Sequence, residues 1–275
     1  MIRDDLTYHR PTSAGEAAEL LAAHGDQATV LGGGTVLVPQ LTRAERRAQH
    51  VVDLRGLGLN TVESDGDMVE VGAMVTYGAV LRTAVTGELT DLLVKAAEVV
   101  TGGCQIRNLG TLGGSAAYAN PSSDVPGCLV ALEADMVVAG PDGSRTVSAA
   151  DFFVDAFTTA LGPGEFLSAM RIRRKAASTS YVKVKAGSSG WPVVAVAATR
   201  DSDTGSVRIA IGAAQGVPVA MDVTDLLDPS RDPQDLVGAV RDRITDPWQD
   251  EQASARYRKH VSGVLARRAI EGLDR

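Results

Sequence analysis

The sequence is poor in cysteine. It contains Cys104 and Cys128, with no CxxC motif, among 275 residues. An iron–sulfur cluster takes four protein ligands, mostly cysteine, so this chain cannot hold such a cluster alone. Two cysteines are also too few for a disulfide framework, which predicts a reduced, cytoplasmic setting.

Basic charge and long apolar runs are lacking too. The net charge is -7, which argues against a nucleic-acid surface, and the basic stretches Arg43–Arg47 and Arg171–Lys175 are short. No run of about twenty apolar residues exists, so no membrane span is expected, and the N-terminus lacks the apolar core of a signal peptide. The four histidines, His9, His24, His50 and His260, have no metal-ligand spacing. We therefore predict structural or surface histidines and no metal site.

Periodicity and capping signals predict alternating strands and helices. Ser13 and Glu16 form a capping box for a helix that ends at Gly25, and Asp91 is the expected cap of a helix over 92–100. Strands are expected at 28–31, 51–54, 68–73, 136–140, 166–172, 181–185, 193–199 and 207–213. Further helices are expected after Thr76, around 129–132, and near 232–240 and 254–270. The small polar stretch 175–180 suggests a boundary, with an α+β C-terminal domain beyond it.

Two glycine clusters about eighty residues apart carry the functional signal. The first is Gly32-Gly33-Gly34-Thr35, and the second is Gly110-Thr111-Leu112-Gly113-Gly114-Ser115. Glycine lets the backbone approach a ligand closely, and successive exposed N–H groups can cradle a diphosphate. No GK[ST] or GxGxxG follows a strand at either cluster, which excludes the P-loop and the Rossmann fingerprint. The pair predicts a dinucleotide held between two loops by another route.

Three residues on either side of the second cluster have chemistry to be assigned. Asp124 could accept hydrogen bonds from ribose hydroxyls or could cap the helix that follows it. Tyr118 could shield a ligand or pack in the core. Cys104 is taken as a small apolar residue, because nothing in the sequence indicates a reactive thiol.

These motifs, in this order, resemble the FAD-binding medium subunit of the molybdenum hydroxylases, the family of carbon monoxide and xanthine dehydrogenases. The family has a GGxS/T-type first loop and a QxRNxGTxGGN/S second loop followed by A-D/N-P-x-x-D. The chain has Gly32–Thr35, then Gln105–Ser115, then Ala119–Asp124. The resemblance covers nearly the whole chain.

The resemblance implies an α+β fold. A two-subdomain FAD-binding region of the vanillyl-alcohol oxidase type, residues 1–175, would precede a small α+β domain, residues 176–275. Gly32 through Val36 and Thr111 through Ser115, with Gly110, would hold the FAD diphosphate. Asp124 would lie by the flavin or its ribityl chain, Phe166 and Leu167 on a flanking strand, and Lys183 near the flavin. Val36 stands where relatives often carry a polar residue, so we expect one side-chain contact to be missing.

The resemblance also implies a function. Family enzymes hydroxylate a small molecule at a molybdopterin centre in a large subunit, and electrons pass through iron–sulfur clusters of a small subunit to FAD and on to an external acceptor. This chain would carry FAD only and no catalytic side chain of its own. The segment 185–192 lacks the arginine and aspartate common in relatives, which keeps a stand-alone flavoenzyme as an alternative. A scaffold that has lost flavin is a third hypothesis, against which the retention of both glycine clusters argues.

Overall fold

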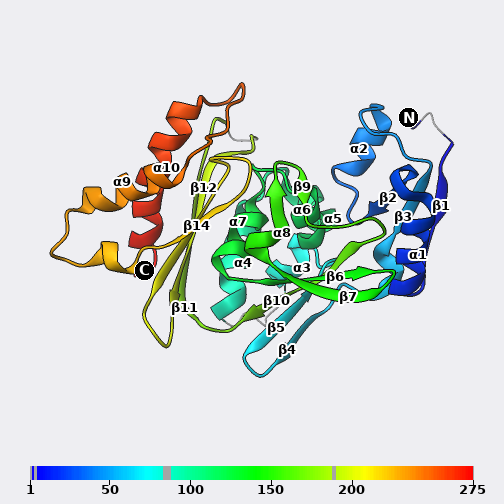
Figure 1. Cartoon of the computed structure of the whole chain (residues 1–275), viewed down its shortest axis with the longest axis horizontal. Coiled ribbons are helices and arrows are strands. Elements are labelled where there is room, and N and C mark those ends of the chain that lie inside the picture. The colour runs from blue at the N-terminus through cyan, green and yellow to red at the C-terminus, as the bar shows by residue number, and fades with distance from the viewer. Residues whose placement is uncertain (1, 3–4, 83–87, 188–189, 275) are drawn as a thin grey trace.

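The computed structural model describes residue 2 and residues 5–82, 88–187 and 190–274. Three sheets follow one another along the long axis of the molecule (Figure 1). The N-terminal sheet stands at one end, a five-stranded sheet lies in the middle, and the C-terminal sheet with its two helices forms the other end. Within the described residues, no helix is both long and apolar enough to cross a membrane.

The N-terminal sheet is parallel, in the order β1-β3-β2. Its elements are β1 (Thr7–His9), α1 (Ala14–His24), β2 (Ala28–Leu31), α2 (Leu37–Thr42) and β3 (His50–Asp53). Ser13 caps α1 by accepting a hydrogen bond from the Glu16 N–H, as predicted. The Glu16 carboxylate accepts from the Thr12 N–H at 2.8 Å, one residue before the cap. Helix α1 ends at Gly25, whose φ of 48° favours glycine.

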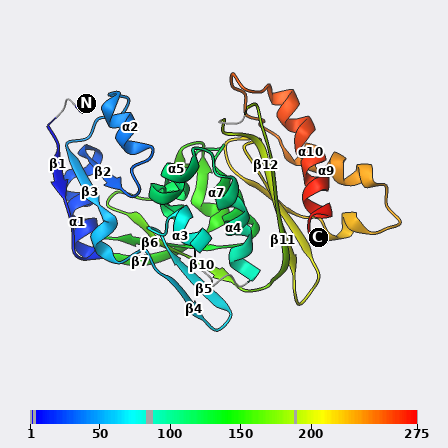
Figure 2. The ribbon, with the colours of Figure 1, turned by 180° about the vertical axis from the view of Figure 1, so that it is seen from behind.

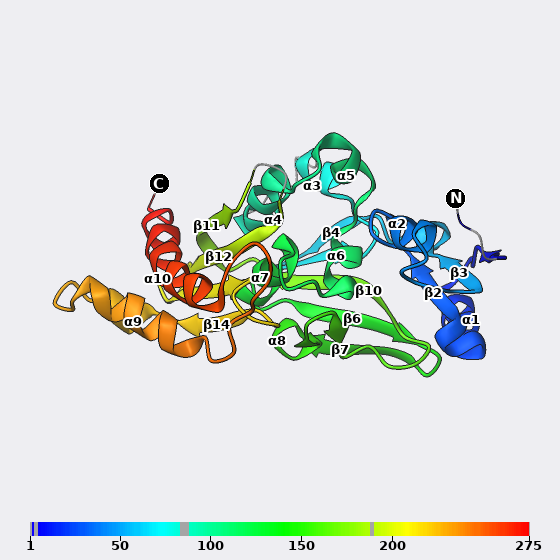
Figure 3. The same cartoon turned by 90° about the horizontal axis from the view of Figure 1, so that it is seen from above.

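The central sheet is antiparallel, in the order β4-β5-β10-β6-β7. Its strands are β4 (Val62–Asp65), β5 (Met68–Gly72), β6 (Asp135–Gly140), β7 (Gly143–Ser148) and β10 (Phe166–Arg173). The associated helices are α3 (Tyr77–Arg82), α4 (Glu88–Val99), α5 (Gly103–Leu109), α6 (Leu112–Tyr118), α7 (Asp124–Ala131) and α8 (Ala149–Phe152), and a small hairpin pairs β8 (Phe153–Asp155) with β9 (Thr158–Thr159). Figure 3 shows α3, α5 and α6 on one side of this sheet. Leu92, Leu112, Leu129 and Met170 are fully buried in the shared core.

The C-terminal sheet is an antiparallel meander with helices on both faces (Figure 2). It consists of β11 (Ala176–Lys185), β12 (Pro192–Asp201), β13 (Val207–Gly212) and β14 (Val219–Asp222), followed by α9 (Pro233–Arg243) and α10 (Ala255–Glu271). Helix α10 contacts β12 on one face, and α7 contacts β12 and β13 from the other. Because both faces are covered, β12 is a continuous apolar run without the alternation of a half-exposed strand.

Three local predictions were wrong. Asp91 does not cap a helix, because α4 begins at Glu88 and the Asp91 carboxylate instead pairs with Lys95 at 2.7 Å. The strand expected at 181–185 begins at residue 176 instead, because the small polar residues 176–180 form the first half of β11. Residues 105–115 are not one loop, because they lie in α5 and α6, which meet at Gly110 and Thr111. In the last two cases, tertiary pairing and packing overcame a local sequence preference for turns.

Candidate functional site

The first glycine cluster joins β2 to α2 and has unused backbone donors. Gly34 has φ of 71°, in the left-handed region. Within the described residues, the N–H groups of Gly33, Gly34, Thr35 and Val36 donate to no protein acceptor. Val36 occupies the N-cap of α2 and offers no side-chain cap. Since these residues are only half-buried, the four donors are accessible to a ligand.

The two glycine clusters lie against each other, as the sequence predicted. A Cβ atom placed on Gly33 would lie 1.8 Å from the carbonyl oxygen of Leu109, at the end of α5. A Cβ on Gly32 would lie 3.2 Å from Thr111 Oγ1. Only glycine at position 33 permits this approach of two backbones. The free N–H groups of the first cluster therefore lie beside the junction of α5 and α6.

The second cluster contributes differently from what we expected, because most of its amides donate within the protein. Leu112 and Gly113 donate to Val75 and Ala73 at 2.9 and 3.0 Å. The Gly114 and Ser115 N–H groups both donate to Thr111, to its Oγ1 and its carbonyl, at 3.0 Å. The Thr111 N–H alone has no acceptor in the described part of the chain.

The glycines of this second cluster have a packing role instead. A Cβ on Gly113 would lie 2.4 Å from the Ala73 Cβ. The start of α6 is thereby held directly against the end of β5. The second cluster is thus a rigid packing surface at the junction of α5 and α6, which we call the wall. It offers one free backbone donor and is not a second loop of free N–H groups.

Asp124 and Lys183 come together in a buried ion pair. Lys183 Nζ donates to Asp124 Oδ1 at 2.7 Å, and both side chains are less than a tenth exposed. The Tyr181 hydroxyl donates to the same oxygen at 2.5 Å, and Lys183 also donates to the Val99 carbonyl. Burial raises the pKa of Asp124, and the charge and hydrogen bond of Lys183 oppose that shift.

This geometry settles the capping alternative for Asp124. Ser123 is the N-cap of α7, and Asp124 is the first helical residue, with its carboxylate turned to β11. Tyr181 was not predicted from sequence. The signal was present, because Tyr181 and Lys183 are two residues apart on one strand and therefore share a face.

The other predicted residues are more dispersed. Phe166 and Leu167 are almost fully buried, in two different core clusters. Tyr118 is half-buried and packs edge-on against Phe157, with ring centroids 5.3 Å apart. Cys104 is exposed on α5. Part of the altered segment 185–192, residues 188–189, lies outside the described residues.

Tyr77 completes the wall formed by the second cluster. It is buried, its side chain hydrogen-bonds that of Ser115, and its N–H donates to the Gly110 carbonyl at 3.2 Å. Burial raises the pKa of this phenol. Sequence alone did not single out Tyr77, since an isolated tyrosine at a helix start is indistinguishable from a core residue.

Comparison with known proteins identifies the family of this chain. Residues 4–173 match the family described as the FAD binding domain in molybdopterin dehydrogenase. The chain belongs to this family. It is 32% identical to the carbon monoxide dehydrogenase medium chain of Afipia carboxidovorans, over 98% of this chain and 97% of that one. It is 30% identical to the glyceraldehyde dehydrogenase medium chain of Sulfolobus acidocaldarius, over 98% and 99% of the two chains.

A solved structure agrees with this assignment. Reconstituted CO dehydrogenase from Oligotropha carboxidovorans contains a chain that superimposes with a TM-score of 0.91, at 31% identity and with 99% of each chain covered. The predicted family, the α+β FAD-binding fold and the FAD cofactor are therefore confirmed. The division at residue 175, the vanillyl-alcohol oxidase-type subdomains and the individual FAD contacts stay predictions.

The residues present fit FAD. A diphosphate carries negative charge. The N–H groups of four successive half-buried residues, which donate to no acceptor in the part of the chain that the structure describes, supply the donors that such a group requires. The close backbone approach at Gly33 places these donors beside the free Thr111 N–H.

Proposed function

We propose that the chain is the flavoprotein subunit of a molybdenum hydroxylase. In that role it holds FAD between the iron–sulfur clusters of a small subunit and an external electron acceptor. A molybdopterin-bearing large subunit completes the complex. The observation that carries the proposal is the set of free donors at Gly33–Val36 beside the second glycine cluster, in a chain that matches medium chains along nearly their whole length.

The proposed roles of the residues follow from their bonding. Gly33, Gly34, Thr35 and Val36 would donate their N–H groups to the diphosphate, and Thr111 would add a fifth donor. When bound, FAD supplies exchange between one-electron and two-electron transfer. Asp124 and Lys183 would position the neighbouring backbone, because their charges already satisfy each other. No side chain of this chain is assigned acid–base chemistry.

The cysteines fit a subunit that carries flavin alone. Cys128 is fully buried, and burial raises the pKa of its thiol, so it is a core residue. Cys104 is exposed at the start of α5. Two cysteines cannot supply a four-ligand cluster, so the proposed complex would carry its iron–sulfur centres in a partner. We propose the cytoplasm as its compartment, on the same low cysteine content.

The test is co-purification from the native host. The expected result is a yellow complex with released FAD equimolar to this chain, together with iron, acid-labile sulfide and molybdenum in two further polypeptides. Reduction by substrate should bleach the flavin absorbance only when the iron–sulfur subunit is present. A chain that purifies alone and turns over with its own substrate would instead establish the stand-alone flavoenzyme. A colourless chain that does not take up added FAD would contradict both.

A further inference from the structure

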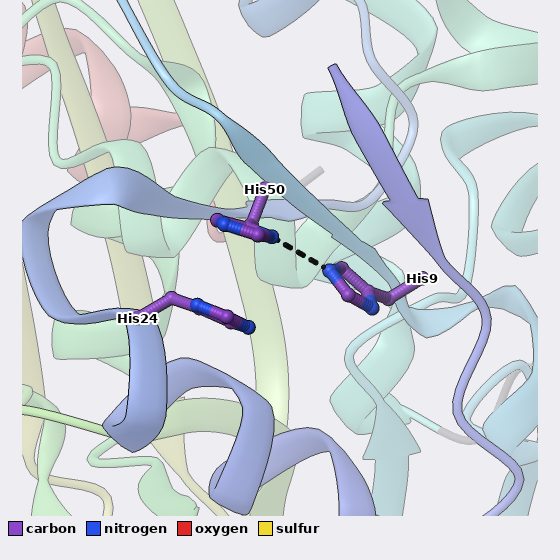
Figure 4. Close-up of side chains that lie close together, drawn as sticks. All are labelled: His9, His24 and His50. Atoms are coloured by element: carbon purple, nitrogen blue, oxygen red, sulfur yellow. Dashed lines mark hydrogen bonds between the residues drawn. The ribbon is translucent and has the colours of Figure 1, made fainter.

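Three of the four histidines converge at the N-terminal end of the molecule. His9 lies on β1, His24 is the last residue of α1, and His50 is the first residue of β3 (Figure 4). Each offers a ring nitrogen, and the three nitrogens lie within 4.8 Å of one another. His9 Nε2 and His50 Nδ1 are 2.9 Å apart, at hydrogen-bond distance. Spacing in the sequence gave no sign of this cluster, because the residues come from three elements.

The fold fixes these positions. In the parallel pair β1–β3, Thr7 pairs with His50 and His9 pairs with Val52. His9 therefore lies two residues from the partner of His50 and on the same face of the sheet. Ala28, four residues after His24, pairs with His50 in β3. The short connection from α1 into β2 thus returns His24 to the start of β3, where its ring stacks on that of His50 with centroids 3.5 Å apart.

We propose that His9, His24 and His50 form a binding site for a divalent transition-metal ion, Zn²⁺ in the first place. The site would have three imidazole ligands and an open position for water. Three imidazoles are a donor set that suits Zn²⁺, Ni²⁺, Cu²⁺ or Co²⁺ and does not suit Mg²⁺ or Ca²⁺, which take oxygen ligands.

The distances are close to those that a metal ion needs. Two nitrogens on one tetrahedral zinc ion lie about 3.3 Å apart. The pair His9 and His50 is already slightly closer than this, and the most separated nitrogens of the cluster need to converge by at most about 1.5 Å. The rings of His24 and His50 are stacked almost parallel, so one of them must also turn about its side-chain bonds before both nitrogens face one ion. All three rings are half-buried, so an ion can reach them from solvent.

The position of His24 also favours a cation. His24 stands at the C-terminal end of an eleven-residue helix, where the helix dipole stabilises positive charge.

This site is separate from the proposed FAD site. The histidines cluster around the start of β3, whereas the glycine cradle follows the end of β2. Because β2 and β3 are parallel, the start of β3 and the end of β2 lie at opposite ends of the strands. A bound ion would tie the three-residue edge strand β1 to β3 and α1, and would thereby anchor the N-terminal strand.

The test is metal binding by the untagged, chelator-treated full chain. We expect one Zn²⁺ per chain by equilibrium dialysis. Co²⁺ should compete with Zn²⁺, and the bound Co²⁺ should show the visible absorption bands of a four- or five-coordinate ion. Mg²⁺ and Ca²⁺ should not compete. His9→Gln, His24→Gln and His50→Gln should each weaken Zn²⁺ binding at least about tenfold. Loss of a residue that only supports a metal ligand already costs about that much affinity, and loss of a direct ligand should cost no less. His260→Gln is the matched control, since His260 lies on α10 against Arg241 and should leave binding unchanged.

A second measurement needs no variant. Diethyl pyrocarbonate modification, read by mass spectrometry, should be slowed by Zn²⁺ at His9, His24 and His50 and unaffected at His260. Absence of stoichiometric binding, equal loss in the His260 variant, or unchanged modification rates at the cluster would overturn the proposal. None of these outcomes depends on whether FAD is bound.

Discussion

Gly33→Ala is the sharpest perturbation of the proposed FAD site. The new methyl carbon would lie 1.8 Å from the Leu109 carbonyl oxygen and 2.7 Å from its carbon. A carbon and an oxygen without strong attraction approach to about 3.3 Å, so the first glycine cluster must move away by about 1.5 Å. Both colliding partners are backbone, and no side-chain rotation relieves the contact.

The size of the effect follows from the bonds that this movement breaks. Hydrogen bonds to a charged group contribute about 1.5–3 kcal/mol each, or roughly 10- to 100-fold in affinity. A displacement of about 1.5 Å is large against a hydrogen bond of about 2.9 Å, so at least one donor at Gly33 or Gly34 should be lost. We therefore expect FAD affinity to fall by at least about tenfold.

The assay is FAD titration of the apoprotein, followed by flavin fluorescence, with far-UV circular dichroism to confirm folding. Gly238→Ala is the matched control. It makes the same change in the middle of α9, where a Cβ meets nothing within 4 Å. That variant should bind FAD normally and gain up to about 1 kcal/mol of stability from helix propensity. Wild-type affinity in folded Gly33→Ala protein would refute the argument that contact between the two clusters places the donors.

Three further predictions concern stability. Lys183→Met should lower the free energy of unfolding by about 3–5 kcal/mol in denaturant titration, because it leaves the buried Asp124 carboxylate without its counter-charge. The double variant with Asp124→Asn should recover much of this loss, and additive losses would contradict the ion pair. Gly113→Ala should cost about 1–3 kcal/mol by overpacking against β5, and an unchanged Tm would contradict the close contact there. The paired Arg145 holds the pKa of Glu165 below its usual 4.5, so the pair stabilises the protein above that pH and the stabilisation is lost as the pH falls through the folded pKa. Glu165→Gln should thus be less stable by about 1 kcal/mol at pH 7, with the difference shrinking below pH 4.5; a pH-independent difference would contradict it.

Elements with strong local signals were predictable from sequence. The helix from Ala14 to His24 has a serine cap, apolar periodicity and a terminal glycine, and it forms with those bounds. The strand into Gly32 was found from a short β-branched run that ends in glycine. Short strands without such a signal were missed, among them β1, which carries His9, and β14. Both are short edge strands specified by their neighbours more than by their own residues.

The site was predictable in its location and not in its bonding. The glycine residues identified both clusters in the sequence. The hypothesis that both bind one ligand then predicted that the two clusters lie together. Sequence could not reveal that the Gly113 N–H already donates to the Ala73 carbonyl, because that acceptor lies forty residues earlier, just after β5. The same limit applies to the histidine cluster, since ligand spacing is informative only when the ligands share one helix or loop.

The distribution of donors explains why two glycine clusters are needed although only one has a run of free N–H groups. A flexible cradle would lose binding energy to the ordering of its backbone. The wall at α5 and α6 removes that loss, because the Gly113 contact with Ala73 and the hydrogen bonds of Thr111 fix its backbone before a ligand arrives. Gly33 then rests on this wall through the Leu109 carbonyl. The first cluster thus supplies most of the donors, and the second fixes where they point.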